Sequence, residues 1–190
     1  MLLLIGLGNP GQRYSLTRHN VGFMIIDAVA HFYEFTSFTK KHDSLVSTGE
    51  IAPHRVMLMK PQLYMNNSGI AVASATTMLK PERVIVFHDD VALQPGVIRV
   101  KLGGSSAGHN GIRSIDSAIG TDYWRVRFGV GRDELCNLSD YVLSEFRNDS
   151  AAMSVVDKIA AQIPILLAGD TSKFVATVSL ANTSSPKENH

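Results

Sequence analysis

The chain has 190 residues, of which 45% are hydrophobic and 18% charged, and its formal net charge is +1. This composition is typical of a globular domain and excludes a disordered protein. The single cysteine, Cys136, excludes an internal disulfide and a cysteine-based metal cage. The apolar start at residues 1–6 is too short for a signal peptide or a membrane span. We therefore expect a soluble, cytoplasmic protein.

Charge is distributed unevenly along the chain. Residues 1–132 contain 14 Lys and Arg against 9 Asp and Glu, for a net charge of +5, whereas residues 133–190 contain 4 against 8, for a net charge of −4. This asymmetry permits an anionic partner on the first part of the chain. It is weaker than the basic excess of a typical nucleic-acid-binding domain, whose pI lies above about 9. Ordinary scatter over a solvated surface accounts for the same charges equally well.

Short apolar runs alternate with stretches in which apolar residues recur at helical spacing. In chain order the pattern predicts a strand at residues 2–7, a helix at 20–34, paired strands at 44–51 and 56–59, a helix at 66–79, strands at 84–87 and 97–102, a helix at 112–119, a strand at 125–130, an apolar helix at 151–167 interrupted by Pro164, and a last helix at 172–181. This order predicts an α/β fold: a single domain at residues 1–182 whose mixed, mostly parallel sheet carries helices on both faces. Residues 183–190 are expected to form a loose polar tail.

The first glycine-rich turn, Gly6-Leu7-Gly8-Asn9-Pro10-Gly11, fits the G-x-G-x-x-G pattern of a dinucleotide site. Such a site needs an acidic residue at the end of the second strand, whereas Asp27, at roughly the right spacing, falls within a predicted helix. Pro10 also removes a backbone N–H where a pyrophosphate needs donors. We therefore expect no nicotinamide cofactor.

The second glycine-rich loop, at residues 104–108, fits the G-x-S-x-G pattern of serine hydrolases, with Ser106 at the nucleophile position. Such a hydrolase needs an acid and then a histidine later in the chain. The later histidines are His109, three residues away, and His190 at the C-terminus, so the triad cannot be assembled in that order. A flexible loop is the better interpretation. The histidines also lack metal-ligand spacing, so no metal site is expected.

Five polar clusters fall at the ends of predicted elements. They are Asn9, Arg18-His19-Asn20, Met65-Asn66-Asn67-Ser68, His88-Asp89-Asp90 and Gly108-His109-Asn110-Gly111. Ligands of an open α/β sheet bind beyond the carboxyl ends of its strands, so Asn9, Asp89 and Asn110 are expected to meet there. Amides suit the recognition of neutral polar groups, and a histidine oriented by a carboxylate suits a base near neutral pH. Taken singly, each cluster is also explained as a turn, a helix cap or a strand end.

The clusters belong to longer blocks that resemble the bacterial peptidyl-tRNA hydrolase family. The blocks are G-L-G-N-P-G-x-x-Y-x-x-T-R-H-N-x-G from Gly6 to Gly22, K-P-x-x-Y-M-N-x-S-G from Lys60 to Gly69, His88-Asp89-Asp90 with Gly96, Lys101-x-Gly103-Gly104 with Gly108-His109-Asn110-Gly111, Arg125-x-Arg127-x-Gly129-x-Gly131-Arg132 and Tyr141-Val142-Leu143. They occur in order across residues 5–146. The departures lie late, where Asp133 replaces a common proline and the last helix lacks the family's usual ending.

The resemblance implies cofactor-free hydrolysis of the ester that joins a peptide's C-terminal carbonyl to the terminal ribose of tRNA, by a monomer. By position, His19 is the general base that activates water, and Asp89 holds its imidazole. Asn66 and Asn110 hold the peptide and water or polarise the carbonyl oxygen. The remaining implied contacts are Asn9 for the peptide or the tRNA end, Tyr14 and Met65 for the shape of the cleft, Tyr64 for binding of the substrate or tRNA, His109 for a gate over the cleft, and Lys101 and Arg127 for tRNA phosphates.

Two other functions compete with this interpretation. The first is a non-catalytic RNA-binding relative on the same fold, and the presence of His19, Asp89, Asn66 and Asn110 together favours the enzyme instead. The second is a hydrolase of small esters or amides that never meets RNA. The basic excess of the first 132 residues favours tRNA over that alternative.

Overall fold

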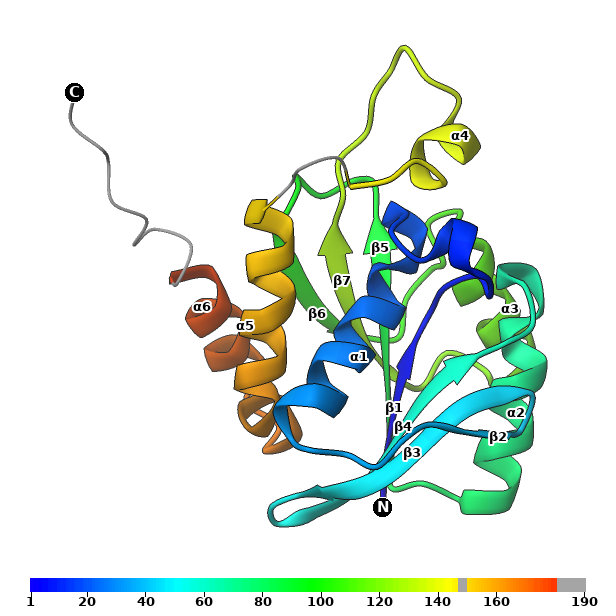
Figure 1. The fold of residues 1–190 in the computed structure, drawn as a ribbon, viewed down its shortest axis with the longest axis vertical. Coiled ribbons are helices and arrows are strands. Elements are labelled where there is room, and N and C mark those ends of the chain that lie inside the picture. The colour runs from blue at the N-terminus through cyan, green and yellow to red at the C-terminus, as the bar shows by residue number, and fades with distance from the viewer. Residues whose placement is uncertain (147–149, 181–190) are drawn as a thin grey trace.

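The computed structural model describes residues 1–146 and 150–180, and one mixed sheet lies at its centre (Figure 1). Among the described residues, seven strands are hydrogen bonded in the order β2-β3-β4-β1-β5-β7-β6. In chain order they are β1 (Leu2–Gly6), β2 (Thr39–Lys41), β3 (Ser44–Ile51), β4 (His54–Pro61), β5 (Arg83–Asp90), β6 (Ile98–Leu102) and β7 (Trp124–Gly129). The expected domain end at residue 182 and the tail at 183–190 lie outside the described residues.

Parallel strands form the centre of the sheet, and antiparallel strands form its edges. β1 is parallel to both β4 and β5, and β5 is parallel to β7. β2–β3, β3–β4 and β6–β7 pair antiparallel. The paired strands predicted at residues 44–51 and 56–59 are the β3–β4 hairpin, which makes the sheet mixed as expected. β2 was not predicted, because its three residues are all exposed and carry no apolar signal.

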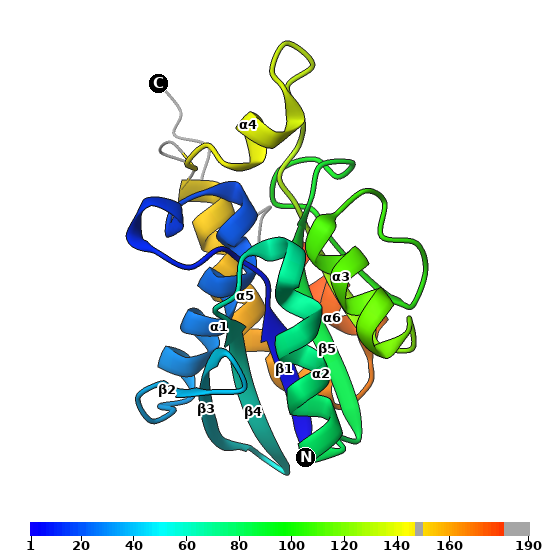
Figure 2. The ribbon, with the colours of Figure 1, turned by 90° about the vertical axis from the view of Figure 1, so that its right-hand side faces the viewer.

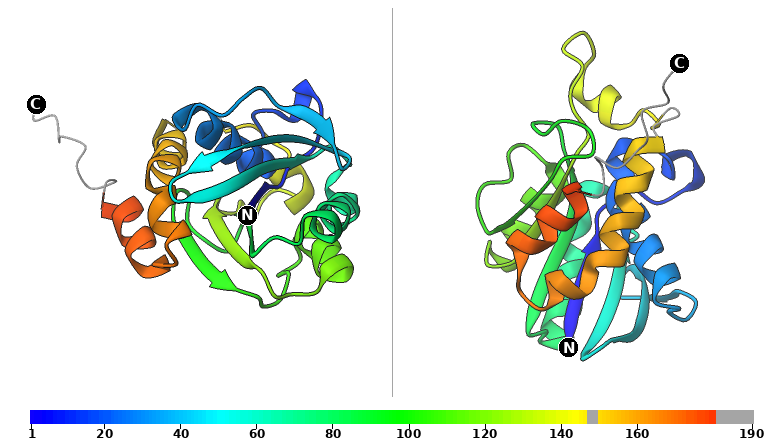
Figure 3. Two further views of the ribbon diagram at one scale, coloured as in Figure 1. Left: turned by 90° about the horizontal axis from the view of Figure 1, so that it is seen from below. Right: turned by 90° about the vertical axis from the view of Figure 1, so that its left-hand side faces the viewer.

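Helices cover both faces of the sheet, which confirms the predicted α/β sandwich (Figures 1 and 2). α1 (Val21–Phe32), α5 (Ser150–Leu167) and α6 (Thr171–Leu180) pack together on one face, and α2 (Ser68–Leu79) and α3 (Asn110–Ile119) pack together on the other. Seen from below, the two helical layers lie apart with the sheet between them (Figure 3). None of the described helices is long and apolar enough to cross a membrane.

Strand β1 explains why the first apolar run of the sequence is unbroken. Leu2 and Leu4 belong to the core beneath α1 and α5, whereas Leu3 and Ile5 belong to the core beneath α2 and α3. None of these four residues is more than 3% exposed. A strand that is buried on both faces needs apolar residues at consecutive positions. β1 is therefore held in place from both faces, and so is the start of the loop that follows it.

Helix α1 lies in direct backbone contact with the two central strands. A Cβ atom added to Gly22 would lie 2.4 Å from the backbone nitrogen of Leu7 and 2.4 Å from the carbonyl oxygen of Phe87. A Cβ atom added to Gly6 would lie 2.1 Å from the carbonyl oxygen of Gly22. Only glycine permits so close an approach of two backbones. The first glycine of the G-x-G-x-x-G pattern therefore serves the packing of a strand against a helix.

In the C-terminal third, one expectation is corrected and one element was not predicted. α5 runs from Ser150 to Leu167 without the break expected at Pro164. Ile163 before the proline and Leu166 after it are buried in the same core, and this packing holds the helix together despite the missing backbone N–H. A short helix, α4 (Leu138–Val142), follows β7 at the top of Figure 1. It was not predicted, because none of its five residues is buried.

Candidate active site

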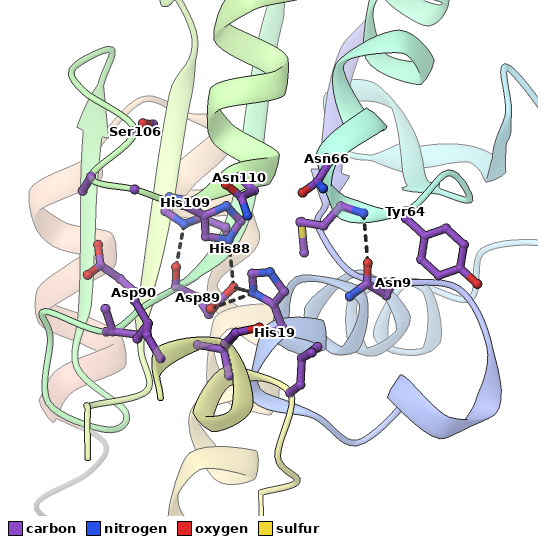
Figure 4. A pocket seen from close by; sticks show the side chains of 18 residues that line it. Asn9, His19, Tyr64, Asn66, His88, Asp89, Asp90, Ser106, His109 and Asn110 are labelled. Carbon is purple, nitrogen blue, oxygen red and sulfur yellow. Dashed lines mark hydrogen bonds and ion pairs between the residues drawn. The ribbon is translucent and has the colours of Figure 1, made fainter. Parts of the chain in front are cut away.

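A cavity of about 430 Å³ opens where the carboxyl ends of β1, β4 and β5 meet (Figure 4). Eight of the eleven residues predicted for the site line it, namely Asn9, His19, Tyr64, Met65, Asn66, Asp89, His109 and Asn110. They come from the loops after β1 and β4, from the end of β5 and from the start of α3. The parallel order of the central strands places these segments at one edge of the sheet, as expected for a crevice beyond strand ends.

His19 and Asp89 make the central contact of the site. Asp89 lies at the end of β5, with only 2% of its side chain exposed. The turn Arg18–Asn20 places Nδ1 of His19 2.9 Å from Oδ1 and 3.0 Å from Oδ2 of Asp89. An ionised carboxylate can only accept hydrogen bonds, so Nδ1 of His19 carries a proton. In the neutral ring, Nε2 therefore keeps a lone pair that can accept a proton.

A second histidine also bonds Asp89. His109 is the N-cap of α3, and its Nδ1 accepts hydrogen bonds from the backbone N–H groups of Gly111 and Ile112 at 3.1 and 3.2 Å. The proton of His109 therefore lies on Nε2, which donates to Oδ1 of Asp89 at 2.9 Å. His109 was expected as a gate over the cleft, and the structure shows a ring with both nitrogens bonded and 8% of its side chain exposed. The ring ties the start of α3, where Asn110 lies, to the carboxylate.

The Asp89 carboxylate sets the ionisation of its surroundings. Burial alone would raise the pKa of Asp89, but the attraction and hydrogen bonds of His19 and His109 lower it well below its usual range. Burial alone would lower the pKa of His19, but the attraction and hydrogen bond of Asp89 reverse this, so the pKa of His19 is raised. His88 donates from Nδ1 to the backbone oxygen of Asp89 at 2.7 Å, and its burial lowers its pKa to about 3. The site thus combines a fixed negative charge with one strengthened base.

Asn9 holds two loops of the site together. Its side-chain oxygen accepts a hydrogen bond from the backbone N–H of Met65 at 2.9 Å. Its own backbone N–H and carbonyl are bonded by the side chain of Asn20, each at 2.9 Å. Asn20 is 1% exposed and was not predicted as a site residue, although its place beside His19 was the available signal. The two asparagines fix the loop after β1 against the turn that precedes α2.

Asn66 and Asn110 lie at the starts of neighbouring helices and flank the space beside His19 (Figure 4). Asn66 lies in the 3-10 turn Met65–Asn67 before α2, and Asn110 is the first residue of α3. Both residues are exposed, and within the described part of the chain neither side-chain amide has a hydrogen-bond partner. Each amide therefore offers two donors and an acceptor to a bound molecule.

Three of the predicted residues lie outside the cavity lining. Tyr14 packs edge-on against Tyr64, with ring centroids 6.4 Å apart. Lys101 and Arg127 lie on β6 and β7 and line a separate cavity of about 120 Å³. Nε of Arg127 donates to Asp90 at 2.7 Å, so this guanidinium is partly engaged within the protein. The two cations lie on the paired strands β6 and β7, as expected from their alternating sequence, with Lys101 opposite Arg125 and Arg127 opposite Arg99.

The remaining wall of the cavity comes from a segment that sequence reasoning missed. Leu138, Ser139 and Val142 of α4, and Leu143 after it, line the cavity opposite the end of the sheet. Leu138 is 41% exposed and Leu143 is 38% exposed, so this wall presents apolar surface to the solvent. The resemblance at residues 141–143 was the signal that could have located it.

In the part of the chain that the structure describes, one set of residues has metal-ligand spacing, and it is the set His19, Asp89 and His109, whose ligand atoms lie within 4.8 Å of one another. Their hydrogen bonds argue against a metal. A neutral histidine binds a metal through its unprotonated nitrogen, whereas Nε2 of His109 carries the proton and Nδ1 caps α3. Since both nitrogens are engaged, His109 is equally unable to serve Ser106 as a base.

Comparisons with known proteins agree with this geometry. The family model of peptidyl-tRNA hydrolase matches residues 3–188. The chain is 66% identical over 181 residues to the peptidyl-tRNA hydrolase of Anaplasma phagocytophilum (strain HZ), over 94% of this chain and 99% of the relative. It is 51% identical over 178 residues to that of Wolbachia pipientis wMel, over 92% and 98% of the two chains. The crystal structure of peptidyl-tRNA hydrolase from Acinetobacter baumannii matches with a TM-score of 0.86 and 34% identity over 94% of each chain. The chain therefore belongs to the peptidyl-tRNA hydrolase family.

Proposed function

We propose that this enzyme hydrolyses the ester bond between the C-terminal carbonyl of a peptide and the 3′-terminal ribose of tRNA. Membership of the family supports the substrate. The observation that carries the proposal is the contact of His19 with Asp89 in a cavity that also holds two unbonded asparagine side chains. Hydrolysis of an ester by water requires an oriented base and nearby donors for the developing oxyanion. The reaction needs no cofactor.

In the proposed first step, Nε2 of His19 takes a proton from water while the water oxygen attacks the ester carbonyl carbon. Asp89 stays ionised and stabilises the imidazolium that forms. Its bond to Nδ1 at 2.9 Å supports this role, because it fixes both the tautomer and the orientation of the ring. The raised pKa of His19 makes the base stronger. General base catalysis of this kind contributes about 10²- to 10⁴-fold in rate.

The attack places a negative charge on the former carbonyl oxygen. A side-chain N–H of Asn66 or Asn110 donates to this oxygen, and one such donor is worth about 3–4 kcal/mol. Collapse of the intermediate breaks the bond between the carbonyl carbon and the ribose oxygen, and the imidazolium of His19 returns its proton to that oxygen. The products are a peptide with a free carboxyl group and tRNA with a free hydroxyl group.

Two sets of residues are proposed to hold the two arms of the substrate. Asn9, Tyr64 and Met65 line the cavity and contact the peptide or the terminal nucleoside. Lys101 and Arg127 contact tRNA phosphates from the neighbouring edge of the sheet. Their position on adjacent strands and the basic excess of residues 1–132 support this assignment.

The proposal is tested by the release of labelled peptide from N-blocked aminoacyl-tRNA, with free aminoacyl-tRNA as the control substrate. The wild-type chain should release the peptide, and His19→Ala should lose at least about 10²-fold in kcat. His31→Ala, at an exposed position of α1, is the matched control and should keep full activity. A folded wild-type protein that binds tRNA but releases no peptide would instead identify a non-catalytic RNA-binding relative.

The tRNA contacts are tested separately with Lys101→Ala. The variant should lose kcat/KM on full peptidyl-tRNA while sparing a peptidyl-nucleoside that lacks the tRNA body. Removing one phosphate contact should also make the slope of log K against log salt shallower by about one unit. Equal losses on both substrates would show that Lys101 supports the fold rather than binding tRNA.

We also propose that the enzyme acts as a cytoplasmic monomer. Membership of the peptidyl-tRNA hydrolase family supports this proposal, because the resemblance implies a monomer that acts in translation. Light scattering at assay concentrations should give the mass of one chain, 20.7 kDa. Specific activity that falls on dilution together with a fall in mass would contradict the proposal.

A further inference from the structure

Arg18 precedes His19 in the turn Arg18–Asn20 but does not line the cavity. Its guanidinium lies instead over the ring of Tyr141 in α4, 4.4 Å from the ring centroid, and 5.6 Å from the centroid of Phe146. Tyr141 does not line the cavity either, whereas its helix neighbours do. Arg18, the residue before the proposed base, therefore stacks on a residue of α4 that does not itself line the cavity.

Hydrogen bonds join Arg18 to the same segment. Nη1 of Arg18 donates to the carbonyl oxygens of Ser144 at 3.3 Å and Glu145 at 3.0 Å, and it also contacts the hydroxyl of Ser144. These partners lie 126 and 127 positions further along the chain. A planar guanidinium can stack on a ring and donate from its edge at the same time, which a lysine ammonium cannot do.

The backbone around Arg18 is joined to this segment as well. The N–H of Arg18 donates to the carbonyl of Ser144 at 3.1 Å, and the N–H of Phe146 donates to the carbonyl of Leu16 at 3.0 Å. An isolated antiparallel bridge lies between these two bonds. Residues 16–18 and 144–146 thus form a short two-stranded ribbon, with the guanidinium of Arg18 closing its side.

Helix α4 depends on such contacts for its position. It has five residues and none of them is buried, so it is too short to be stable by itself and has no core to dock into. A further side-chain bond runs from the hydroxyl of Tyr141 to the carbonyl oxygen of Val130 at 2.8 Å. Tyr141 therefore links α4 to the end of β7 and also receives the guanidinium of Arg18.

We infer that Arg18 is a positioning residue that fixes the α4 wall of the cleft to the turn that carries His19, so that the width of the cleft and the place of the base are set together. This inference rests on the proposed function for its kinetic test only. Loss of Arg18 frees the wall without removing any group that touches the reacting atoms.

The kinetic test uses Arg18→Ala, Tyr141→Ala and the double variant on peptidyl-tRNA. Each single change should lower kcat/KM about tenfold, and the double change should cost clearly less than the product of the two single losses, because the stacking contact between the two side chains is lost in either variant. The kcat/KM of Arg18→Lys should be close to that of Arg18→Ala, since a lysine ammonium cannot both stack on the ring and donate the hydrogen bonds of the guanidinium. Losses that multiply in the double variant would mean that the two residues act independently, and would overturn the inference.

Hydrogen exchange tests the same contact without reference to activity. In Arg18→Ala and in Tyr141→Ala, the amide of Phe146 should exchange at least about tenfold faster, while the amides of β1 keep their protection. Unchanged exchange at Phe146 in both variants would overturn the inference even if the proposed function holds. An inactive wild-type chain that shows the expected exchange would leave the coupling intact and overturn the proposed function alone.

Arg13→Ala is the matched control for charge. Arg13 is an exposed arginine of the same loop, and its contact is local, with the guanidinium 4.5 Å from the ring centroid of Tyr14. It should change kcat/KM by less than about twofold and leave the exchange of Phe146 unaltered. Arg13→Ala and Arg18→Ala could instead lose kcat/KM equally and show equally weaker dependence on salt. That result would mean that Arg18 attracts tRNA by its charge, and it would overturn the inference that Arg18 joins α4 to the His19 turn.

Discussion

On one side of the cleft, Asp89 is buried at the end of a central strand and is bonded by two histidines, one of which caps a helix. On the other side, α4 buries none of its residues and meets the rest of the protein through the Arg18 ribbon and the hydroxyl of Tyr141. The Asp89 side is positioned by a strand and a helix that belong to the packed core of the protein. The α4 side is positioned by a few polar contacts. We therefore propose that the reaction takes place on the Asp89 side and that the α4 side contributes contacts to the bound peptide.

The largest effect is expected from Asp89→Asn, which keeps the shape of the first side but removes its charge. It should lower kcat by about 10³- to 10⁴-fold, because the amide no longer fixes the productive tautomer of His19. It should also move the acid limb of the rate profile to lower pH, since burial then acts alone and lowers the pKa of His19. A pH series of single-turnover rates measures both, with Asp43→Asn, at an exposed position, as the control. A change in KM alone would contradict the proposal that Asp89 orients the general base His19.

The next effect concerns the two unbonded amides. Asn66→Ala should lower kcat by about 10²- to 10³-fold if its side chain donates to the oxyanion. Asn67 lies in the same turn, is exposed and makes no cap hydrogen bond with its side chain, so Asn67→Ala should stay near wild type. Rates under saturating peptidyl-tRNA provide the measurement. Equal damage from the two substitutions would show that the turn, rather than the Asn66 amide, matters.

His109→Ala should have a smaller effect on rate and an opposite effect on pH dependence. Without the bond from His109, the carboxylate of Asp89 attracts His19 more strongly, so the pKa of His19 rises further and the acid limb moves to higher pH. Loss of the N-cap of α3 should lower the free energy of unfolding by about 1 kcal/mol. His109→Asn should restore the cap but not the pH profile. An acid limb that moves to lower pH in both variants would refute this arrangement.

The smallest effect is expected on the α4 side. Leu138→Ala should raise KM by about two- to fivefold without changing kcat, because a partly exposed leucine contributes apolar contact to a bound peptide and none to the reaction. Leu135, in the preceding loop, is 96% exposed and does not line the cavity, so Leu135→Ala is the control. Steady-state kinetics decide between them. A loss confined to kcat would mean that α4 takes part in the chemistry.

The Asp89 side was largely predictable from sequence, because its signals are local. The apolar run of β1 and the polar residues that end β1 and β5 located Asn9 and Asp89, and parallel strands bring such ends together. The pairing of His19 with Asp89 came from the resemblance, and the structure places the two side chains in contact. Their roles in the reaction remain predictions.

The α4 side was not predictable from local signals. A five-residue helix without buried side chains has no apolar period, so no local pattern predicts it as a helix. The Arg18 contacts that help to place it join residues more than 120 positions apart, and single-sequence patterns do not report such pairs. A different reason hid the bond of His109 to Asp89, because the tautomer of His109 depends on its hydrogen bonds with the backbone of α3.

The close backbone contact of α1 with the central strands lies a few residues from both His19 and Asp89. Gly22 lies three positions after His19, and its missing side chain lets the helix rest directly on Leu7 and Phe87, two positions before Asp89. The methyl group of alanine at Gly22 would clash with these backbone atoms and push the start of α1, with the His19 turn, away from the strand that carries Asp89. A scan of all substitutions should therefore find Gly22 as intolerant as His19, because of the volume of any added side chain rather than because of chemical reactivity.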